Sequence, residues 1–303
     1  HGQLKLRTKE CKARHFNFFC TLYLSLPYSS YFNKLSRLGF FTCSLIFTSA
    51  CSTPSANFHK QASQYNFNSE RIATSLFSHT LYTNQFIDSN STDTLHIYLD
   101  GDGSPWFNRK SIAKDPTSRN HMILALMSLD KAPAILLGRP CYHRLSPKPN
   151  CHPKLWTSHR YSPIVINSMQ IALTQWLTLH PNITSITFIG YSGGGAIASL
   201  LAPLFPQTKQ LITFAANLDT DAWTKLHDYS PLTGSLNPIL QKKLPSHIKQ
   251  LHIAGELDTN VPPSIIQNYI SKEERSNILI IKSQEHCCWT VHWLTILGRI
   301  KPK

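Results

Sequence analysis

The chain has 303 residues, of which 42% are hydrophobic and 15% are charged. This composition suits one substantial folded domain and argues against long disordered arms. The formal charge is +14, but seven of the basic side chains lie in the first 50 residues. The others are spread along the chain without Lys/Arg blocks or interleaved aromatic residues, which argues against nucleic-acid binding.

Residues 1–50 have the features of an export signal. Lys34 and Arg37 precede the apolar run 38–47, and small residues then lead to Cys51. The run is too short for a typical transmembrane helix. This arrangement resembles the lipobox of bacterial lipoproteins, with a threonine where leucine is usual, and implies cleavage before Cys51 and lipidation there in the cell envelope. The alternatives are a plain secretory signal, giving a periplasmic or secreted protein, and an anchor resting on the membrane.

The folded domain is expected at 79–303. Residues 51–78 are largely polar at their start, and we expect them to form a tether in front of the domain. Two β-rich runs, 79–87 and 94–99, flank a polar turn and predict an antiparallel hairpin.

A loop with two aspartates, Asp100 and Asp102, follows the second of these runs. Paired aspartates are one way to bind Ca²⁺. The remaining oxygen ligands of an EF-hand-like loop are missing, however, so the sequence does not require a cation here.

A helix is predicted over 122–129, a buried strand over 134–138 and a long Pro-rich loop over 139–161. Connecting loops of this length are usually lids, binding loops or disordered segments. We expect an ordered wall, because the loop contains a pair of cysteines.

Four cysteines follow Cys51, an even number that suits disulfides in an oxidising compartment. Cys141 and Cys151 are the easiest pair to close, since they bracket a short Pro-rich segment. Pairing with Cys287 or Cys288 is the other possibility. A metal site is also conceivable, but its ligand spacing fits no common zinc pattern; its ligands would be Cys141, His143, Cys151 and His152.

The stretch 184–201 predicts a strand, a sharp turn and a helix. Residues 184–189 are β-branched and aromatic, and the segment from residue 195 is rich in Ala and Leu. The turn between them reads G-Y-S-G-G over 190–194 and matches the nucleophile elbow G-x-S-x-G, centred on Ser192. A plain Gly-rich turn or a phosphate-binding loop is the alternative, although no phosphate-loop glycine pattern is present. The elbow is the residue pattern by which the chain resembles the α/β-hydrolase superfamily.

Strands and helices alternate along the rest of the chain. Strands are predicted over 210–216, 249–254 and 277–281, and helices over 162–179, 263–270 and 289–297, with a Pro-containing insertion over 220–246. Such alternation predicts a mostly parallel sheet covered by helices on both faces. The expected class is α/β, with the α/β-hydrolase fold and short lid or cap insertions.

The resemblance implies a catalytic triad in the order Ser, acid, His. Downstream of Ser192, Asp258 follows a predicted strand and His286 follows the last one. Strand ends of an open α/β sheet converge on one edge, so these side chains can meet. A serine hydroxyl needs such a base, and the base needs an orienting acid.

Other residues compete for the two supporting roles. Glu256 and Asp219 are rivals for the acid, since Asp219 follows the preceding strand, where some hydrolases place it. A helix cap is the structural alternative for Asp219. His292 is the rival base, but it falls inside the closing helix.

The resemblance also implies an oxyanion hole made by two backbone N–H groups, those of Gly193 and Asp102. Many members carry His-Gly where this chain has Asp100-Gly101. No cofactor or metal is needed for this chemistry. The expected activity is cleavage of an ester or thioester through an acyl-enzyme, and the alternatives are an acyltransferase, a peptidase or a non-catalytic binding module on the same fold.

Three segments, 138–142, the elbow and 286–289, together resemble a group of bacterial exported hydrolase-like proteins whose substrates are not assigned. The expected partner is a small acyl substrate, with membrane contact only through the N-terminal anchor. Insertions 139–161 and 220–246 should line the acyl pocket with aromatic residues, although these could equally pack the cap onto the core. Neither is apolar or long enough for a deep lipase lid, so we expect short or medium acyl chains.

Overall fold

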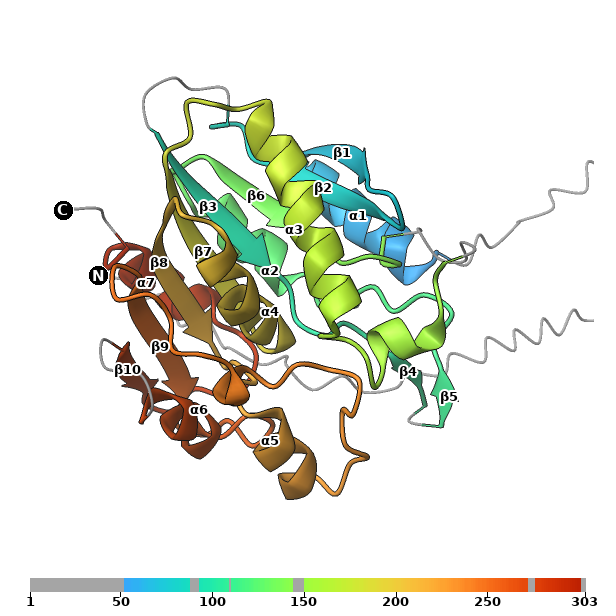
Figure 1. Cartoon of the computed structure of the whole chain (residues 1–303), viewed down its shortest axis with the longest axis vertical. Helices are drawn as coiled ribbons and strands as arrows, with labels where there is room; N and C mark the ends of the chain where they lie inside the picture. Colours follow the sequence, from blue (N-terminus) through green and yellow to red (C-terminus); the bar gives the residue numbers. More distant parts are fainter. Residues whose placement is uncertain (1–51, 88–92, 109, 144–149, 272–275, 301–303) are drawn as a thin grey trace, which may run out of the picture. The chain divides into compact units, whose positions relative to one another are not determined.

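The computed structural model describes residues 52–87, 93–108, 110–143, 150–271 and 276–300. The chain from Ser52 onward belongs to one compact unit, and the expected export signal and Cys51 lie outside the described residues. The unit contains an eight-stranded sheet with helices packed against it and a separate two-stranded hairpin (Figure 1).

The large sheet has the strand order β1-β2-β6-β3-β7-β8-β9-β10. Neighbouring strands from β6 to β10 pair in parallel, whereas β2 is antiparallel to both β1 and β6. The sheet is therefore mostly parallel, as predicted. Its strands are β1 (Asn68–Ala73), β2 (Ser78–Thr83), β3 (Thr94–Leu99), β6 (Ala134–Leu137), β7 (Ser185–Tyr191), β8 (Thr208–Phe214), β9 (Lys249–Gly255) and β10 (Ser276–Ile281).

Helices alternate with these strands along the chain. The α-helices are α1 (Pro54–Gln64), α2 (Met122–Ser128), α3 (Pro163–Thr178), α4 (Gly193–Leu201), α5 (Thr220–Leu226), α6 (Pro263–Ile270) and α7 (Thr290–Leu297). Short 3-10 helices are η1 (Pro153–Trp156), η2 (Ala202–Leu204) and η3 (Pro238–Leu240), and the small hairpin consists of β4 (Trp106–Phe107) and β5 (Ser111–Ile112). Among the described helices, none is long and apolar enough to cross a membrane.

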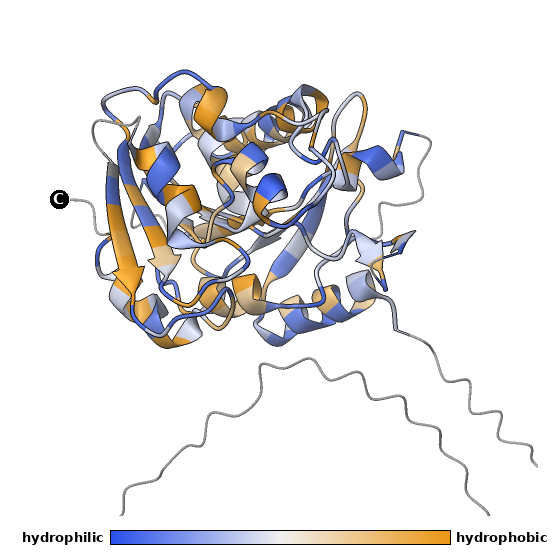
Figure 2. Ribbon diagram, turned by 90° about the horizontal axis from the view of Figure 1, so that it is seen from below, coloured by the Kyte–Doolittle hydropathy of each residue, from blue (hydrophilic) through white to orange (hydrophobic). Residues whose placement is uncertain are grey.

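Both faces of the sheet are buried. Along β7, Ile186 and Phe188 belong to the core that α3 and α4 cover, whereas Ile189 and Tyr191 belong to the core that α1, α2 and α7 cover. Successive side chains of a strand point to opposite faces, so a strand in this position must be apolar throughout. Figure 2 shows the result as hydrophobic residues concentrated in the strands and in the adjoining parts of the helices.

The expectation of a tether over 51–78 is wrong, because α1 and β1 fold within this stretch. Thr53 caps α1 by accepting a hydrogen bond from the amide of Ala56, and Pro54 starts the helix. Phe58 and Ala62, one helical turn apart, are fully buried against the sheet. Because most residues of α1 are polar, the sequence did not indicate the narrow apolar face that these two residues form.

The antiparallel hairpin expected from 79–87 and 94–99 is also wrong. Each run contains a strand, which ends at Thr83 in the first, but β6 lies between them and pairs antiparallel with β2 and parallel with β3. The polar turn indicated that the chain reverses there, yet a partner from much later in the sequence occupies the space between the two strands. Local patterns identify strands more reliably than they identify strand partners.

Candidate active site

Ser192 lies on a strained turn between β7 and α4. Its backbone has φ 50° and ψ −121°, a region that non-glycine residues rarely adopt. A side chain at Gly190 would place its Cβ 2.5 Å from the carbonyl oxygen of Gly194 and 2.6 Å from the Cα of Gly195. Glycine is required there because strand and helix meet so closely.

The structure brings Ser192, His286 and Asp258 together. His286 Nε2 lies 3.1 Å from Ser192 Oγ, and His286 Nδ1 lies 2.8 Å from Asp258 Oδ2. The three residues follow β7, β10 and β9, parallel strands whose carboxyl ends lie at the same edge of the sheet. This is the hydrogen-bonded chain that an activated serine needs.

The Asp258 carboxylate is held by the loop that follows β9. Its side chain is fully buried, and its Oδ1 accepts hydrogen bonds from the backbone amides of Asn260 (2.9 Å) and Val261 (2.8 Å). Because one oxygen is occupied by these two amides, the other is directed to the imidazole. The loop thus fixes the acid as well as supplying it.

Two aromatic residues hold the His286 loop. The hydroxyl of Tyr191 (3.1 Å) and the indole N–H of Trp289 (2.8 Å) both donate to the His286 carbonyl oxygen. The Tyr191 ring also lies 5.3 Å from the imidazole, centroid to centroid. Sequence reasoning missed both roles, because Tyr191 is a variable position of the elbow motif and only a three-dimensional contact connects it to the histidine.

The rival residues have other contacts. Asp219 caps α5 by accepting from the amide of Ala222 (3.1 Å), which is the structural alternative weighed for it. Glu256 accepts from the amide of Ser283 (2.9 Å). His292 lies within α7. The Asp219 and Glu256 carboxylates thus hydrogen-bond residues other than Ser192 and His286.

The loop after β3 runs beside the nucleophile. A Cβ built on Gly101 would lie 3.5 Å from the Cβ of Ser192. Gly193 is the first residue of α4, where backbone N–H groups have no acceptor within their own helix. Both expected oxyanion donors, the amides of Gly193 and Asp102, therefore belong to segments that flank Ser192.

The Asp102 side chain does something that the sequence did not indicate. Its carboxylate accepts from Arg139 (2.9 Å), Arg160 (2.8 Å) and the Tyr161 hydroxyl (2.7 and 2.8 Å). We call these four residues the Asp102 cluster. The carboxylate lies so close to Gly193 that a side chain at this glycine would overlap it. A Ca²⁺ site at this loop is thereby disfavoured, since two guanidinium groups occupy the carboxylate.

The charges of the Asp102 cluster sum to a positive value. Burial acts to raise the pKa of Asp102, but the charges of Arg160 and Arg139 lower it to about 2, so the carboxylate is ionised at neutral pH. Two guanidinium groups then face one carboxylate beside Gly193. The neighbouring Asp100 differs, because burial raises its pKa to about 7 despite the Gly101 amide and the charge of Arg139.

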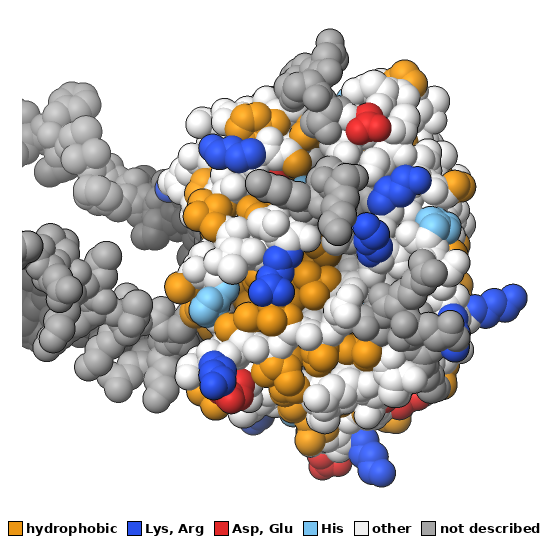
Figure 3. All heavy atoms as spheres, turned by 90° about the vertical axis from the view of Figure 1, so that its left-hand side faces the viewer, with side chains coloured by type: hydrophobic (Ala, Val, Ile, Leu, Met, Phe, Trp, Pro, Cys, Tyr) orange, Lys and Arg blue, Asp and Glu red, His pale blue; other side chains and the backbone are white. Residues whose placement is uncertain are grey.

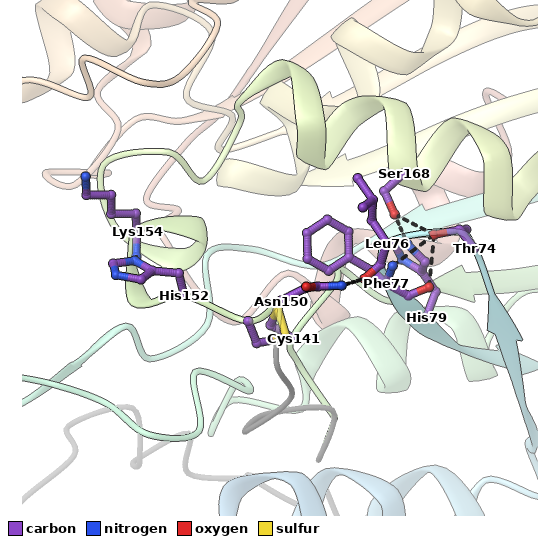
Figure 4. Close-up of a disulfide and its surroundings, with 10 residues drawn as sticks. Thr74, Leu76, Phe77, His79, Cys141, Asn150, His152, Lys154 and Ser168 are labelled. Atoms are coloured by element: carbon purple, nitrogen blue, oxygen red, sulfur yellow. Dashed lines mark hydrogen bonds between the residues drawn. A yellow bond between two sulfur atoms is a disulfide. The ribbon is translucent and has the colours of Figure 1, made fainter.

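A disulfide between Cys141 and Cys151 closes the first insertion, as expected. Figure 4 shows its surroundings, where Asn150 donates to the carbonyl oxygen of Leu76 in the turn between β1 and β2 (2.8 Å). The bond excludes these cysteines as ligands of the alternative metal site. Among the described residues, no group of three or more His, Cys, Asp or Glu side chains could hold a metal ion.

The aromatic residues of the insertions pack onto neighbouring loops. Trp156 is buried and donates to the carbonyl oxygen of Ala113 (3.1 Å), and the Tyr142 hydroxyl donates to that of Asp102 (3.0 Å). In the second insertion, Trp223 donates to the carbonyl oxygen of Asn260 (3.0 Å). These contacts favour the packing interpretation for the three aromatic residues and connect both insertions to loops of the site.

A second Ser–His pair lies away from the elbow. His79 Nε2 is 2.7 Å from Ser168 Oγ, and His79 Nδ1 is 2.9 Å from the carbonyl oxygen of Gly138 (Figure 4). Both side chains are buried, and this burial lowers the pKa of His79 to about 4. Because this pair is shielded from solvent, we interpret its hydrogen bond as structural. Ser168 therefore serves as a control serine for tests of Ser192.

No protein-family model and no curated protein matches the sequence. Solved structures resemble its fold, among them a candidate lipase from Acinetobacter baumannii AYE (TM-score 0.54, 11% identity, covering 82% of this chain and 94% of that one). The esterase Pf2001 of Pyrococcus furiosus has a TM-score of 0.54 and 14% identity, covering 80% and 92%. The α/β hydrolase GrgF of Penicillium sp. sh18 has a TM-score of 0.53 and 14% identity, and the match covers 77% of this chain and 96% of that one. With its parallel sheet, its elbow and these likenesses, the chain has the α/β-hydrolase fold.

Proposed function

We propose that the protein is a serine hydrolase that cleaves a carboxylic ester or thioester through an acyl-enzyme. The observation that carries the proposal is the hydrogen-bonded chain from Ser192 Oγ through His286 to Asp258, with the serine on a strained turn. An unassisted hydroxyl is a poor nucleophile at neutral pH, and this arrangement removes that limitation. The likeness to structures named as esterase and lipase supports the same class.

The reaction has two halves. Ser192 Oγ attacks the acyl carbon while its proton moves to His286 Nε2, and the imidazolium that forms is stabilised by the Asp258 carboxylate. The leaving alcohol or thiol takes that proton as the tetrahedral intermediate collapses to the acyl-enzyme. A water molecule then attacks the acyl carbon, gives its proton to His286, and the acid is released as Ser192 regains a proton.

The developing oxyanion is assigned to the backbone N–H groups of Gly193 and Asp102. A lone carboxylate next to Gly193 would oppose negative charge on the substrate oxygen. The two arginines of the Asp102 cluster offset that charge. The cluster also ties the loop after β3 to the first insertion, which keeps the Asp102 backbone at the site.

The substrate proposal is a short or medium acyl ester. The first insertion is closed by a disulfide, and Trp156 and Tyr142 are buried in packing rather than left as an open apolar channel. A long acyl chain would need such a channel or a movable lid. A panel of nitrophenyl esters of increasing acyl length should therefore show the highest kcat/KM for the shorter members.

Labelling by a fluorophosphonate probe tests the nucleophile. We expect the purified protein to be labelled, Ser192→Ala to be unlabelled, and Ser168→Ala to be labelled like the wild type, because Ser168 is buried beside His79. Equal labelling of the wild type and Ser192→Ala, or no labelling of either, would defeat the proposal. Labelling without Ser192-dependent ester turnover would point to a peptidase or an acyltransferase.

A further inference from the structure

The β4–β5 hairpin leaves large apolar side chains in solvent. Trp106 is 45% exposed, Phe107 56% and Ile112 42%. Figure 1 shows the hairpin apart from the eight-stranded sheet, and its two strands pair only with each other. Three such side chains on a short hairpin are unusual for a surface that faces only water, and they suggest a binding element.

The apolar groups lie on both faces of the hairpin. Trp106 is directly opposite Ile112, and Phe107 is directly opposite Ser111. Directly opposed residues share a face and successive residues alternate, so Trp106 and Ile112 occupy one face and Phe107 the other. A flat protein surface would cover one face and leave the other in water. A lipid layer surrounds a protruding hairpin and covers both, and aromatic rings favour the interfacial region of a bilayer.

Charge around the hairpin favours an anionic surface. Lys110, Lys114 and Arg119 are exposed on the hairpin and the segment that follows it. The acidic residue of this region, Asp115, accepts hydrogen bonds from the amides of Ser55 (2.9 Å) and Thr117 (3.1 Å). Basic side chains beside interfacial aromatic residues are attracted to anionic lipid headgroups.

The segments on either side of the hairpin in the sequence contact the start of the domain and the nucleophile. Ser55, near the start of α1, contacts both Asp115 and Thr117, which closely follow β5. On the other side, the loop that precedes β4 contains Gly101, the neighbour of Ser192. The start of the folded domain at α1 therefore contacts the segment that follows the hairpin.

We propose that the β4–β5 hairpin docks on the surface of an anionic phospholipid bilayer, with Trp106, Phe107 and Ile112 in the headgroup and upper acyl region and Lys110 at the phosphates. Docking would hold the elbow edge of the sheet near the lipid surface. The binding surface is independent of the catalytic residues.

Vesicle flotation tests the proposal with the full chain carrying Cys51→Ser, so that lipidation cannot dominate. We expect Trp106→Ser/Phe107→Ser/Ile112→Ser to bind vesicles of equal phosphatidylglycerol and phosphatidylcholine about tenfold more weakly. Lys110→Gln should weaken binding about fivefold on these vesicles and leave it unchanged on phosphatidylcholine alone. Circular dichroism confirms that the variants are folded.

The matched control is a second set of exposed apolar side chains, Ile280 on β10 with Val291 and Leu294 on α7. Figure 3 shows the side of the molecule on the left of Figure 1, where β10 and α7 lie, with hydrophobic side chains gathered among Lys and Arg. Val291→Ser/Leu294→Ser should bind vesicles like the parent chain. Equal losses in the two sets of variants would mean non-specific adhesion and would overturn the proposal, as would a loss in the control alone.

A second measurement remains informative even if residues 1–50 hold every variant on the vesicles. Lipids with brominated acyl chains quench tryptophans that enter the bilayer, so Trp106→Phe should lower the quenched fraction of the emission and Trp223→Phe should not. No difference for Trp106→Phe contradicts docking. Loss of self-association in the hairpin variants, with unchanged vesicle binding, would identify a second copy as the occupant instead. Ser192→Ala should bind normally, which separates this proposal from the proposed function.

Discussion

Asp258 and Asp219 follow neighbouring strands but have different contacts, and their substitution identifies the acid of the proposed triad. Asp258→Asn keeps the size of the side chain but cannot orient a protonated imidazole, so kcat should fall by about 10³–10⁴ with little change in unfolding. Asp219→Asn should leave kcat nearly unchanged, because Asp219 caps α5 and does not bind His286. Measuring ester turnover and urea unfolding of both variants decides which aspartate is the acid. Loss of turnover in Asp219→Asn alone would reassign the acid.

Asp100 should make stability depend on pH. Burial raises its pKa to about 7 in the native state, whereas an unfolded aspartate titrates near about 3.9. Between these values the native state binds more protons, so this residue's contribution to the free energy of unfolding falls as pH rises. Asp100→Asn should flatten the slope and be the more stable protein at about pH 8, by an amount on the order of a few kcal/mol. Urea midpoints across this range test it, with exposed Asp221→Asn as the control.

At the scale of elements, the Asp102 cluster connects the loop after β3 to the first insertion. Its arginines precede and follow the disulfide, and both are buried. Asp102→Asn leaves two buried guanidinium groups without their carboxylate, so we expect a loss of about 3–5 kcal/mol in the free energy of unfolding. Exposed Asp228→Asn should change it by less than about 0.5 kcal/mol. Similar unfolding of the two variants would show that the cluster is not an important contact.

The disulfide stabilises the same insertion by another route. A link between residues ten positions apart restricts the unfolded chain by about 2–3 kcal/mol in the loop-entropy model. Cys141→Ser/Cys151→Ser should lose that amount in urea unfolding while keeping fluorophosphonate labelling. Non-reducing peptide mapping should yield a linked peptide that contains both of these residues. A peptide that joins Cys141 to the His286 loop would contradict the pairing.

For the molecule as a whole, the sequence predicted what depends on local patterns. The elbow, the alternation of strands and helices, and the order of Ser192, Asp258 and His286 can all be read in short windows. What could not be read depends on partners distant in the chain. The pairing of β2 and β3 with β6 is one example, and the Asp102 carboxylate, bound by arginines from two ends of an insertion, is another.

The N-terminal prediction lies outside the described residues and concerns the whole molecule's location. We propose that the chain is cleaved before Cys51, lipidated there and held at the cell envelope, so that the β4–β5 hairpin reaches the same membrane. Mass spectrometry of the mature N-terminus should find a lipid-modified cysteine. An unmodified cysteine at a cleaved N-terminus would favour a secreted protein, and an uncleaved chain would contradict both.

The separation of Ser192 and His286 along the chain means that the ribosome makes the nucleophile well before its base. Ser192 and His286 are 94 positions apart, and the histidine follows the last strand. A ribosome that adds about 5–20 residues per second needs roughly 5–20 s to pass from one to the other. Throughout that interval the growing chain holds a serine with no proton acceptor. Any product of premature termination before His286 would be equally inert, so the proposed esterase becomes reactive only after the segment that follows β10 has been made.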